Sequence, residues 1–203
     1  MLMYSQMRSL PNIRSTVIDR LESLSGDSSA VVFVYVDYKD PATQSLANIL
    51  ANFLKQLLER FEATPLPLDL CQSLNQIQSK LRSNHVELRE YVKLIRCAAK
   101  YFVSVYFVID ALDECDSSSF RRSFLASMRD VVDDISNVKL LITSRPHISI
   151  ENVFNQIEEI ELRASPSDLR AYALVKLGTY AHISESLKAK ILHELLSKTD
   201  GTY

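Results

Sequence analysis

The sequence predicts an α/β fold built on a mainly parallel, doubly wound sheet. Short apolar runs rich in valine and isoleucine alternate along the 203 residues with longer segments whose apolar side chains recur at helical spacing. An apolar run without alternation is typical of a strand that helices cover on both faces of a parallel sheet. Helical segments between such runs are the connections that parallel strands require. We therefore expect one sheet with flanking helices.

The first half of the chain is predicted to be mostly helical. Apolar spacing indicates helices over residues 13–24, 46–61, 69–81 and 86–100, and a β-branched run indicates a strand over residues 30–36. Asp40 and Pro41 supply a cap and a first-turn proline ahead of the second helix. The Thr-Pro-Leu-Pro segment at residues 64–67 ends that helix, because proline lacks a backbone donor and restricts the residue before it.

The second half of the chain is predicted to alternate strands with helices. Apolar runs indicate strands over residues 103–109, 138–142 and 157–162, and a helix over residues 118–132 connects the first two. Ser165 and Pro166 begin a further helix that Gly178 ends, and Ser184 caps another that reaches Gly201. We expect these last two helices to form a small C-terminal helical appendage.

The composition excludes several classes of function. Only 3 of the 203 residues are glycine, whereas average usage would give roughly 14. Gly26, Gly178 and Gly201 lie far apart, and a loop that cradles phosphates needs several glycines close together. We therefore expect no dinucleotide fingerprint and no intact P-loop. With 23 basic and 25 acidic residues, the chain also lacks the basic face that nucleic acid or an anionic membrane requires.

The cysteines and the apolar runs predict a soluble, cytoplasmic protein. Cys71, Cys97 and Cys115 are an odd, scattered set, which argues against a disulfide framework and against a zinc site. Residues 1–10 lack the apolar core of a secretory signal. The longest apolar run, residues 101–112, contains an aspartate and is shorter than the about 20 residues that span a bilayer.

The strongest candidate for chemistry follows the strand predicted over residues 103–109. Ligands of open α/β sheets bind beyond the carboxyl ends of the strands, and residues 106–114, Tyr-Phe-Val-Ile-Asp-Ala-Leu-Asp-Glu, have the pattern of a Walker B segment. We predict Asp110 as the Mg²⁺ ligand, Glu114 as the catalytic residue that orients or deprotonates water, and Asp113 as a second carboxylate near the cofactor. Alternatively, Asp113 and Glu114 simply begin the next helix, where negative charge is favourable.

The end of the next strand carries a second set of candidates. Residues 140–146, Leu-Leu-Ile-Thr-Ser-Arg-Pro, place Thr143, Ser144 and Arg145 at a neighbouring strand end. A planar guanidinium suits phosphate oxygens, so we predict Arg145 as a catalytic sensor of the terminal phosphate, and Thr143 and Ser144 as cofactor-binding. Alternatively, Arg145 pairs with a carboxylate such as Glu114, and the two hydroxyls cap a turn.

Three segments resemble the NACHT-type NTPase domain of fungal STAND proteins, in the version described as the nephrocystin-3-like N-terminal domain. They are residues 36–40 (Val-Asp-Tyr-Lys-Asp), 108–115 (Val-Ile-Asp-Ala-Leu-Asp-Glu-Cys) and 142–146 (Ile-Thr-Ser-Arg-Pro). The resemblance implies a P-loop NTPase-like (ASCE) sheet with strand order 5-1-4-3-2. It also implies binding of ATP or GTP with Mg²⁺ that switches a multidomain, repeat-containing receptor between closed and oligomeric states. In these terms Asp110 and Glu114 are the Walker B pair and Arg145 is the sensor.

The beginning of the chain departs from that family. Its members have an apolar strand and a glycine-rich loop ending in Gly-Lys-Ser/Thr before the helix that residues 13–21 resemble. Residues 7–11, Met-Arg-Ser-Leu-Pro, stand in that place without glycine or lysine. We expect residues 1–12 to be degenerate or truncated, with the first strand and the P-loop missing or degenerate. Residues 13–163 would form the NACHT-like core and residues 164–203 the start of a truncated helical subdomain.

These observations leave three hypotheses about function. The first is a degenerate or truncated NTPase module that binds nucleotide weakly or not at all. It would have a scaffold or regulatory role, and its partners would be itself, through exposed strand edges, or other STAND domains. The second is a metal-dependent phosphodiesterase in which Asp37, Asp40, Asp110, Asp113 and Glu114 hold Mg²⁺, although the chain lacks a basic track for a polynucleotide. The third is an inactive fragment of a longer gene product.

Overall fold

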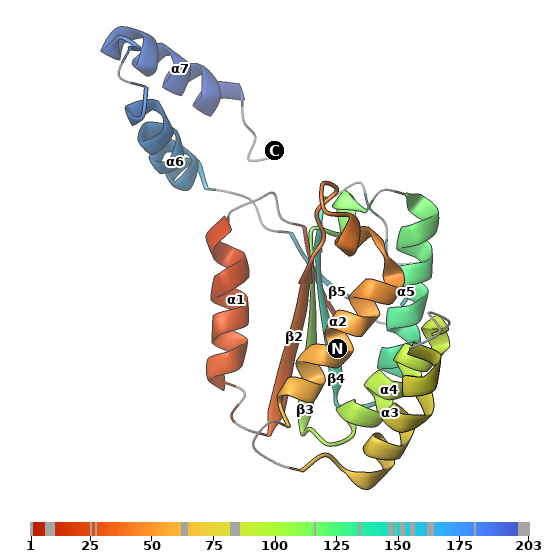
Figure 1. Cartoon of the computed structure of the whole chain (residues 1–203). Helices are drawn as coiled ribbons and strands as arrows, with labels where there is room; N and C mark the ends of the chain where they lie inside the picture. The colour runs from red at the N-terminus through yellow and green to blue at the C-terminus, as the bar shows by residue number, and fades with distance from the viewer. Residues whose placement is uncertain are drawn as a thin grey trace. The chain divides into compact units, whose positions relative to one another are not determined.

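The computed structural model describes most of the 203 residues. The described residues are 2–6, 11–24, 26, 28–61, 65–81, 86–115, 117–133, 135–145, 148, 150, 153–154, 157–161, 165–180 and 182–198. Two compact units divide the chain, Met1–Ile160 and Glu161–Tyr203. The first unit is an α/β domain (Figure 1), and the second is a pair of helices.

A five-stranded sheet forms the centre of the first unit, with the strand order β2-β3-β4-β1-β5. The strands are β1 Leu2–Gln6, β2 Ser29–Tyr35, β3 Ser104–Asp110, β4 Val138–Ser144 and β5 Glu158–Glu161. The pairs β2–β3, β3–β4 and β1–β4 are parallel. Counted from the opposite edge, this is the order 5-1-4-3-2 that the resemblance implied, so the prediction of a mainly parallel sheet of this type is confirmed.

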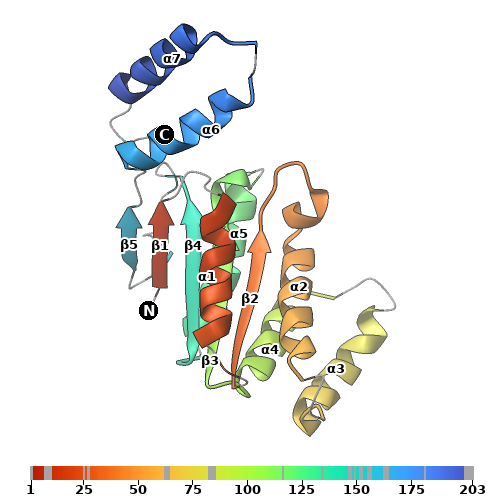
Figure 2. The same ribbon diagram turned by 90° about the vertical axis from the view of Figure 1, so that its left-hand side faces the viewer.

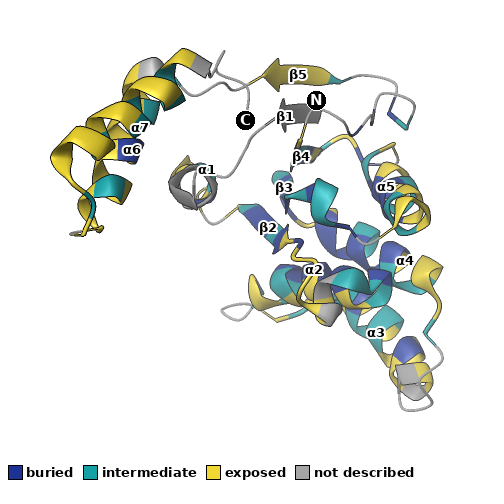
Figure 3. Ribbon diagram, turned by 90° about the horizontal axis from the view of Figure 1, so that it is seen from above, coloured by how far each residue is buried: buried dark blue, intermediate teal, exposed yellow. Residues whose placement is uncertain are grey.

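The helices follow the predicted pattern closely. In the first unit they are α1 Pro11–Leu24, α2 Leu46–Glu59, α3 Leu68–Leu81, α4 Leu88–Ala99 and α5 Ser118–Asp133, with short 3₁₀ turns η1 Pro41–Gln44 and η2 Leu112–Glu114. Helix α1 lies on one face of the sheet, whereas α2, α4 and α5 cover the other (Figures 1 and 3). The chain therefore has the layered arrangement that the apolar strands predicted.

The first strand corrects one expectation. We expected it to be missing or degenerate, but β1 pairs with β4 from Leu2 opposite Leu140 to Gln6 opposite Ser144. A segment this short is stabilised because it lies between β4 and β5 and forms a ladder within the sheet (Figure 2). Strand β4 therefore has neighbours on both sides. The expected P-loop position, residues 7–10, lies outside the described residues.

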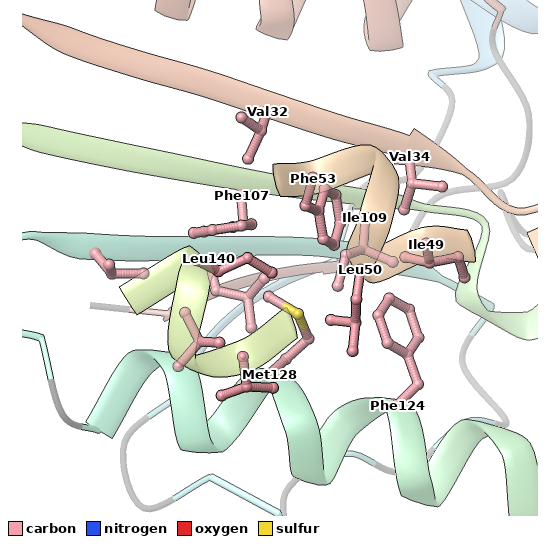
Figure 4. Packing of buried hydrophobic residues seen from close by; sticks show 14 of the residues in the cluster. Val32, Val34, Ile49, Leu50, Phe53, Phe107, Ile109, Phe124, Met128 and Leu140 are labelled. Atoms are coloured by element: carbon pink, nitrogen blue, oxygen red, sulfur yellow. The ribbon is translucent and has the colours of Figure 1, made fainter. Parts of the chain in front are cut away.

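The main core lies between the sheet and helices α2, α4 and α5. Helix α2 buries a continuous apolar face, which includes Ile49, Leu50 and Phe53. The Phe53 ring meets the Phe107 ring of β3 edge to face, with centroids 5.2 Å apart. Figure 4 shows these side chains together with Phe124 and Met128 of α5. The apolar face of α2 therefore belongs to the core. On the opposite face, α1 forms a smaller cluster through Ile18.

Strand β2 lies at one edge of the sheet, and a side chain supplies part of the partner that it lacks. The Gln56 carboxamide of α2 accepts a hydrogen bond from Phe33 N–H (2.9 Å) and donates one to Phe33 C=O (2.8 Å). It therefore pairs with Phe33 as a residue of a neighbouring strand would. Such pairing satisfies backbone groups that would otherwise be exposed on an open edge.

A polar cluster connects α3 to the end of α4. Tyr101 O–H donates a hydrogen bond to Asp69, and Cys97 Sγ lies 3.5 Å from the other carboxylate oxygen. The hydrogen bond from Tyr101 lowers the pKa of Asp69, and the same bond raises the pKa of Tyr101 to about 12. Burial and the Asp69 charge raise the pKa of Cys97. The cluster is most stable with Tyr101 protonated and Asp69 ionised.

The second unit contains α6 Pro166–Gly178 and α7 Glu185–Lys198. Helix α6 begins with a capping box, in which the Ser165 side chain accepts from Asp168 N–H and the Asp168 carboxylate accepts from Ser165 N–H. Ala173 of α6 is buried. Among the described residues of both units, no helix combines the length and apolar character needed to cross a membrane.

Candidate functional site

The carboxylate of Asp110 lies at the carboxyl end of β3 and is held by β4. Asp110 is the last residue of the strand and is only 4% exposed. Thr143 O–H donates a hydrogen bond to Asp110 Oδ1, and the same hydroxyl accepts one from Ala111 N–H at 3.0 Å. A buried carboxylate is costly to ionise unless hydrogen bonds or a cation stabilise it. Thr143 therefore both orients Asp110 and anchors the start of the following loop.

The residue after Asp110 has an unusual backbone conformation. Ala111 has φ 58° and ψ 47°, in the left-handed region, which costs a residue with a Cβ about 1–2 kcal/mol. This turn directs Leu112 into the core, where it is fully buried, and begins η2 with a hydrogen bond from Glu114 N–H to Ala111 C=O at 2.9 Å. Asp113 and Glu114 thus belong to a separate turn that precedes α5. The alternative that they simply begin the next helix is wrong.

Asp113 holds Arg145 through two contacts. Asp113 Oδ2 lies 3.0 Å from Arg145 Nε, and Asp113 Oδ1 accepts a hydrogen bond from Arg145 N–H at 3.2 Å. The Asp113 side chain is 8% exposed, whereas the Arg145 side chain is 54% exposed. The alternative that Arg145 pairs with a carboxylate is therefore confirmed, and the carboxylate is that of Asp113 rather than that of Glu114. Because two atoms of Arg145 bind one carboxylate, Asp113 restricts the direction of the guanidinium.

Thr143 and Ser144 are the last residues of β4, not the first residues of a turn. Their backbones continue the ladder because β1 lies beside them, with Ser5 opposite Thr143 and Gln6 opposite Ser144. Ser144 is 1% exposed, and its hydroxyl has no hydrogen-bond partner within the described part of the chain. A buried hydroxyl of this kind is uncommon and costs about 1–3 kcal/mol.

Sequence reasoning missed Gln44, the last residue of η1. Its Nε2 donates to Asp37 C=O at 3.0 Å and lies 3.3 Å from Glu114 C=O, to which it also donates. Gln44 therefore connects the loop after β2 to the loop after β3. Nothing in the sequence marked it, because a glutamine in a loop is typical of the surface.

The carboxylates after β2 serve the loop in which they lie. Asp37 Oδ1 accepts from Lys39 N–H at 2.8 Å, and Asp40 Oδ1 accepts from Ala42 N–H at 3.0 Å. A hydrogen bond to Tyr38 and the charges of Asp37 and Glu114 raise the pKa of Lys39. The described residues contain no group of three or more acidic, histidine or cysteine side chains that could hold a metal ion. The geometry does not support the hypothesis of a five-carboxylate phosphodiesterase site.

The six predicted site residues gather at the ends of two adjacent strands. Asp110 ends β3, and Asp113 and Glu114 follow it, while Thr143 and Ser144 end β4 and Arg145 follows it. The arrowheads of β1, β2 and β4 point toward the same edge of the sheet (Figure 2). This is the edge at which ligands bind in open α/β sheets.

The fold of the chain resembles that of P-loop ATPases. Cdc6p from Pyrobaculum aerophilum is similar with a TM-score of 0.51 and 11% identity, over 85% of this chain and 42% of that protein. A Walker-type ATPase of Pyrococcus abyssi is similar with a TM-score of 0.50 and 10% identity, over 98% of this chain and 59% of that one. At these identities the similarity concerns the fold alone.

A family assignment follows from the sequence. A sequence model of the family described as "Nephrocystin 3, N-terminal" matches residues 13–145, more than half of the chain. The chain therefore belongs to the nephrocystin-3 N-terminal family, as the three quoted segments predicted. Comparison with curated protein sequences gave no match.

Proposed function

We propose that this chain is a degenerate NACHT-type nucleotide module of a STAND signalling protein, with weak or no nucleotide binding and a scaffold or regulatory role. The observation that carries the proposal is the end of β3 and the loop after it, where Thr143 hydrogen-bonds Asp110 and Arg145 hydrogen-bonds Asp113. Residues 7–11, by contrast, contain neither glycine nor lysine. The residues that would bind Mg²⁺ and the terminal phosphate are therefore in place at the ends of β3 and β4. The glycines and the lysine of a phosphate-binding loop, whose backbone N–H groups form a nest for phosphates, are absent from residues 7–11.

The oxygen atoms at the ends of β3 and β4 fit a magnesium ion. Mg²⁺ prefers hard oxygen ligands and retains several waters. Asp110 supplies a buried carboxylate, and Ser144 supplies a buried hydroxyl that has no partner among the described residues. We assign Asp110 as the residue that would hold the ion, with Thr143 and Ser144 at the cofactor. A bound Mg²⁺ neutralises charge on phosphate oxygens.

The remaining residues have distinct proposed roles. Glu114 would orient a water molecule or accept its proton. Arg145 would contact the terminal phosphate, because its planar guanidinium matches phosphate oxygens. Asp113 would contribute to cofactor binding by holding Arg145, since both of its oxygens contact that residue.

Titration of Mg·ATP and Mg·GTP into the purified chain tests the proposal. We expect no saturable binding tighter than about 1 mM, which corresponds to a binding free energy of only about −4 kcal/mol. We also expect no hydrolysis above that of the Asp110→Asn variant. Micromolar affinity, or turnover that Asp110→Asn removes, would show that the module is active rather than degenerate.

A gain-of-function variant tests whether the residues at the ends of β3 and β4 can take part in nucleotide binding once a P-loop is supplied. Replacing residues 7–10 with a glycine-rich loop that ends in Gly-Lys-Thr would supply the backbone donors and the lysine of a P-loop. In this loop-restored variant we expect Mg·ATP to bind at about 10–100 μM, a gain of about 1.4–2.7 kcal/mol over a 1 mM complex. Asp110→Asn in the same background should reverse the gain. A folded loop-restored variant that does not bind Mg·ATP contradicts the assignment of Asp110 and its neighbours.

A further inference from the structure

Gln44 joins the loops that follow two neighbouring strands. Its carboxamide nitrogen carries two hydrogens and donates to two backbone carbonyls, that of Asp37 after β2 and that of Glu114 after β3. Gln44 is half-buried, and the bond to Glu114 spans 70 residues of sequence. From this geometry we infer that Gln44 is a positioning residue, which fixes the backbone that carries the Glu114 carboxylate.

The segment that carries Gln44 is itself held in place. Asp37 C=O accepts a second hydrogen bond from Asp40 N–H at 3.0 Å, and Asp40 caps η1 through Ala42 N–H. Directly after Gln44, the Ser45 side chain caps α2, whose apolar face is buried in the core. Gln44 therefore extends from an anchored turn, and its side chain loses less freedom on binding than one on an open loop.

The hydrogen bond from Gln44 to Glu114 complements the contacts that Thr143 and Arg145 make with the same loop. Thr143 holds the beginning of the acidic loop at Asp110 and Ala111, and Arg145 binds Asp113 in its middle. Gln44 acts on Glu114, at the far end of η2, and from the opposite neighbouring strand. The contacts of Thr143, Arg145 and Gln44 together fix the backbone position from which the Glu114 side chain extends. This inference rests on the proposed function, because Glu114 matters as a base only if nucleotide is the ligand.

Hydrogen exchange of the Gln44→Met variant tests the inference directly. Methionine has nearly the same length but no donor, so Glu114 C=O loses its bond to Gln44. We expect the amides of Glu114 and Cys115, which close η2, to exchange about tenfold faster, the effect of losing about one neutral hydrogen bond. The matched control is Gln72→Met, an exposed glutamine of α3, and it should leave these amides unchanged. Gln44→Glu also keeps the length and lacks the donor at neutral pH, so it should repeat the result.

The loop-restored variant supplies a second measurement. There Gln44→Met should lower kcat for Mg·ATP hydrolysis about tenfold with KM nearly unchanged, because Gln44 contacts the Glu114 backbone and not the nucleotide. Unchanged exchange at Glu114 and Cys115 in both Gln44 variants, or an equal rise in Gln72→Met, overturns the inference. A loss in KM alone also overturns it. If the loop-restored variant binds no nucleotide, the proposed function fails, and the exchange measurement by itself decides whether Gln44 holds the loop.

Discussion

Gln56 is expected to stabilise the protein far more than an ordinary glutamine on a helix. Its carboxamide makes two hydrogen bonds to Phe33, at 2.9 and 2.8 Å, in a partly buried position on edge strand β2. Gln56→Met keeps the length of the side chain and removes both bonds. The N–H and C=O of Phe33 then lose their partners while the side chain of α2 still covers them.

The magnitude follows from these two bonds. Each neutral hydrogen bond contributes about 0.5–1.5 kcal/mol, and a buried polar group left without a partner costs about 1–3 kcal/mol. Because the edge admits some water, we expect a loss of about 2–4 kcal/mol. For a chain of this length, a change of 1 kcal/mol shifts the midpoint by about 2–4 °C. The melting temperature of Gln56→Met should therefore fall by about 4–16 °C.

Urea unfolding followed by circular dichroism measures the effect. Gln72→Met, on the exposed side of α3, is the matched control and should change the free energy of unfolding by less than about 0.5 kcal/mol. Gln56→Glu keeps the acceptor for Phe33 N–H and loses the donor to Phe33 C=O, so it should be destabilised as well. If Gln56→Met is as stable as Gln72→Met, the interpretation of Gln56 as a substitute strand partner is wrong.

Three further predictions concern other parts of the first unit. Ala111→Gly relieves a left-handed backbone at φ 58° and should leave the free energy of unfolding unchanged or raise it by up to about 1 kcal/mol. The control Ala98→Gly, in the buried part of α4, should lower the free energy of unfolding by about 1 kcal/mol or more. A larger loss in Ala111→Gly than in Ala98→Gly would show that the conformation of Ala111 is not strained. The hydrogen bond to Asp69 raises the pKa of Tyr101 from 10.0 to about 12. The proton is therefore held more tightly in the folded state, the stabilisation is complete below pH 10, and it is lost as the pH rises toward 12. The wild type should accordingly lose more stability than Tyr101→Phe between these two pH values, and parallel curves would refute the assignment. Phe53→Ala removes a fully buried ring and should cost about 3–5 kcal/mol in urea unfolding; a cost below about 1 kcal/mol would mean that Phe53 is not a core residue.

Most elements of the fold were predictable because each depends on a local pattern. The face of α2 that includes Ile49, Leu50 and Phe53 repeats at helical spacing, and it is the face that packs on the sheet. Strand β3 is a continuous apolar run, and its order relative to β2 and β4 followed from the resemblance. The predicted position of Asp110 at a strand end is also confirmed, since β3 ends at Asp110, where the apolar run changes to acidic residues.

The first strand was not predictable from its own residues. The segment Leu2–Gln6 is too short to show a period, and it forms β1 because β4 and β5 lie on either side of it. The partner of Arg145 was also uncertain, because several carboxylates follow β3 in sequence. In the folded chain the backbone turns into the left-handed region at Ala111, and Asp113, rather than Glu114, contacts Arg145.

By itself the sequence determined the α/β class, the acidic loop after a buried strand, and the absence of glycine and lysine from residues 7–11. These are properties of composition and of short periods, which neighbouring residues establish. Tertiary structure alone decided that β1 completes the sheet and that Gln44 and Gln56 bond to backbone groups 70 and 23 residues away. The physical reason is that a glutamine has the same preference for helix or loop whether its side chain is exposed on the surface or bonds to a distant backbone group. Whether its amide faces water or a distant carbonyl depends on the packing that brings the two together.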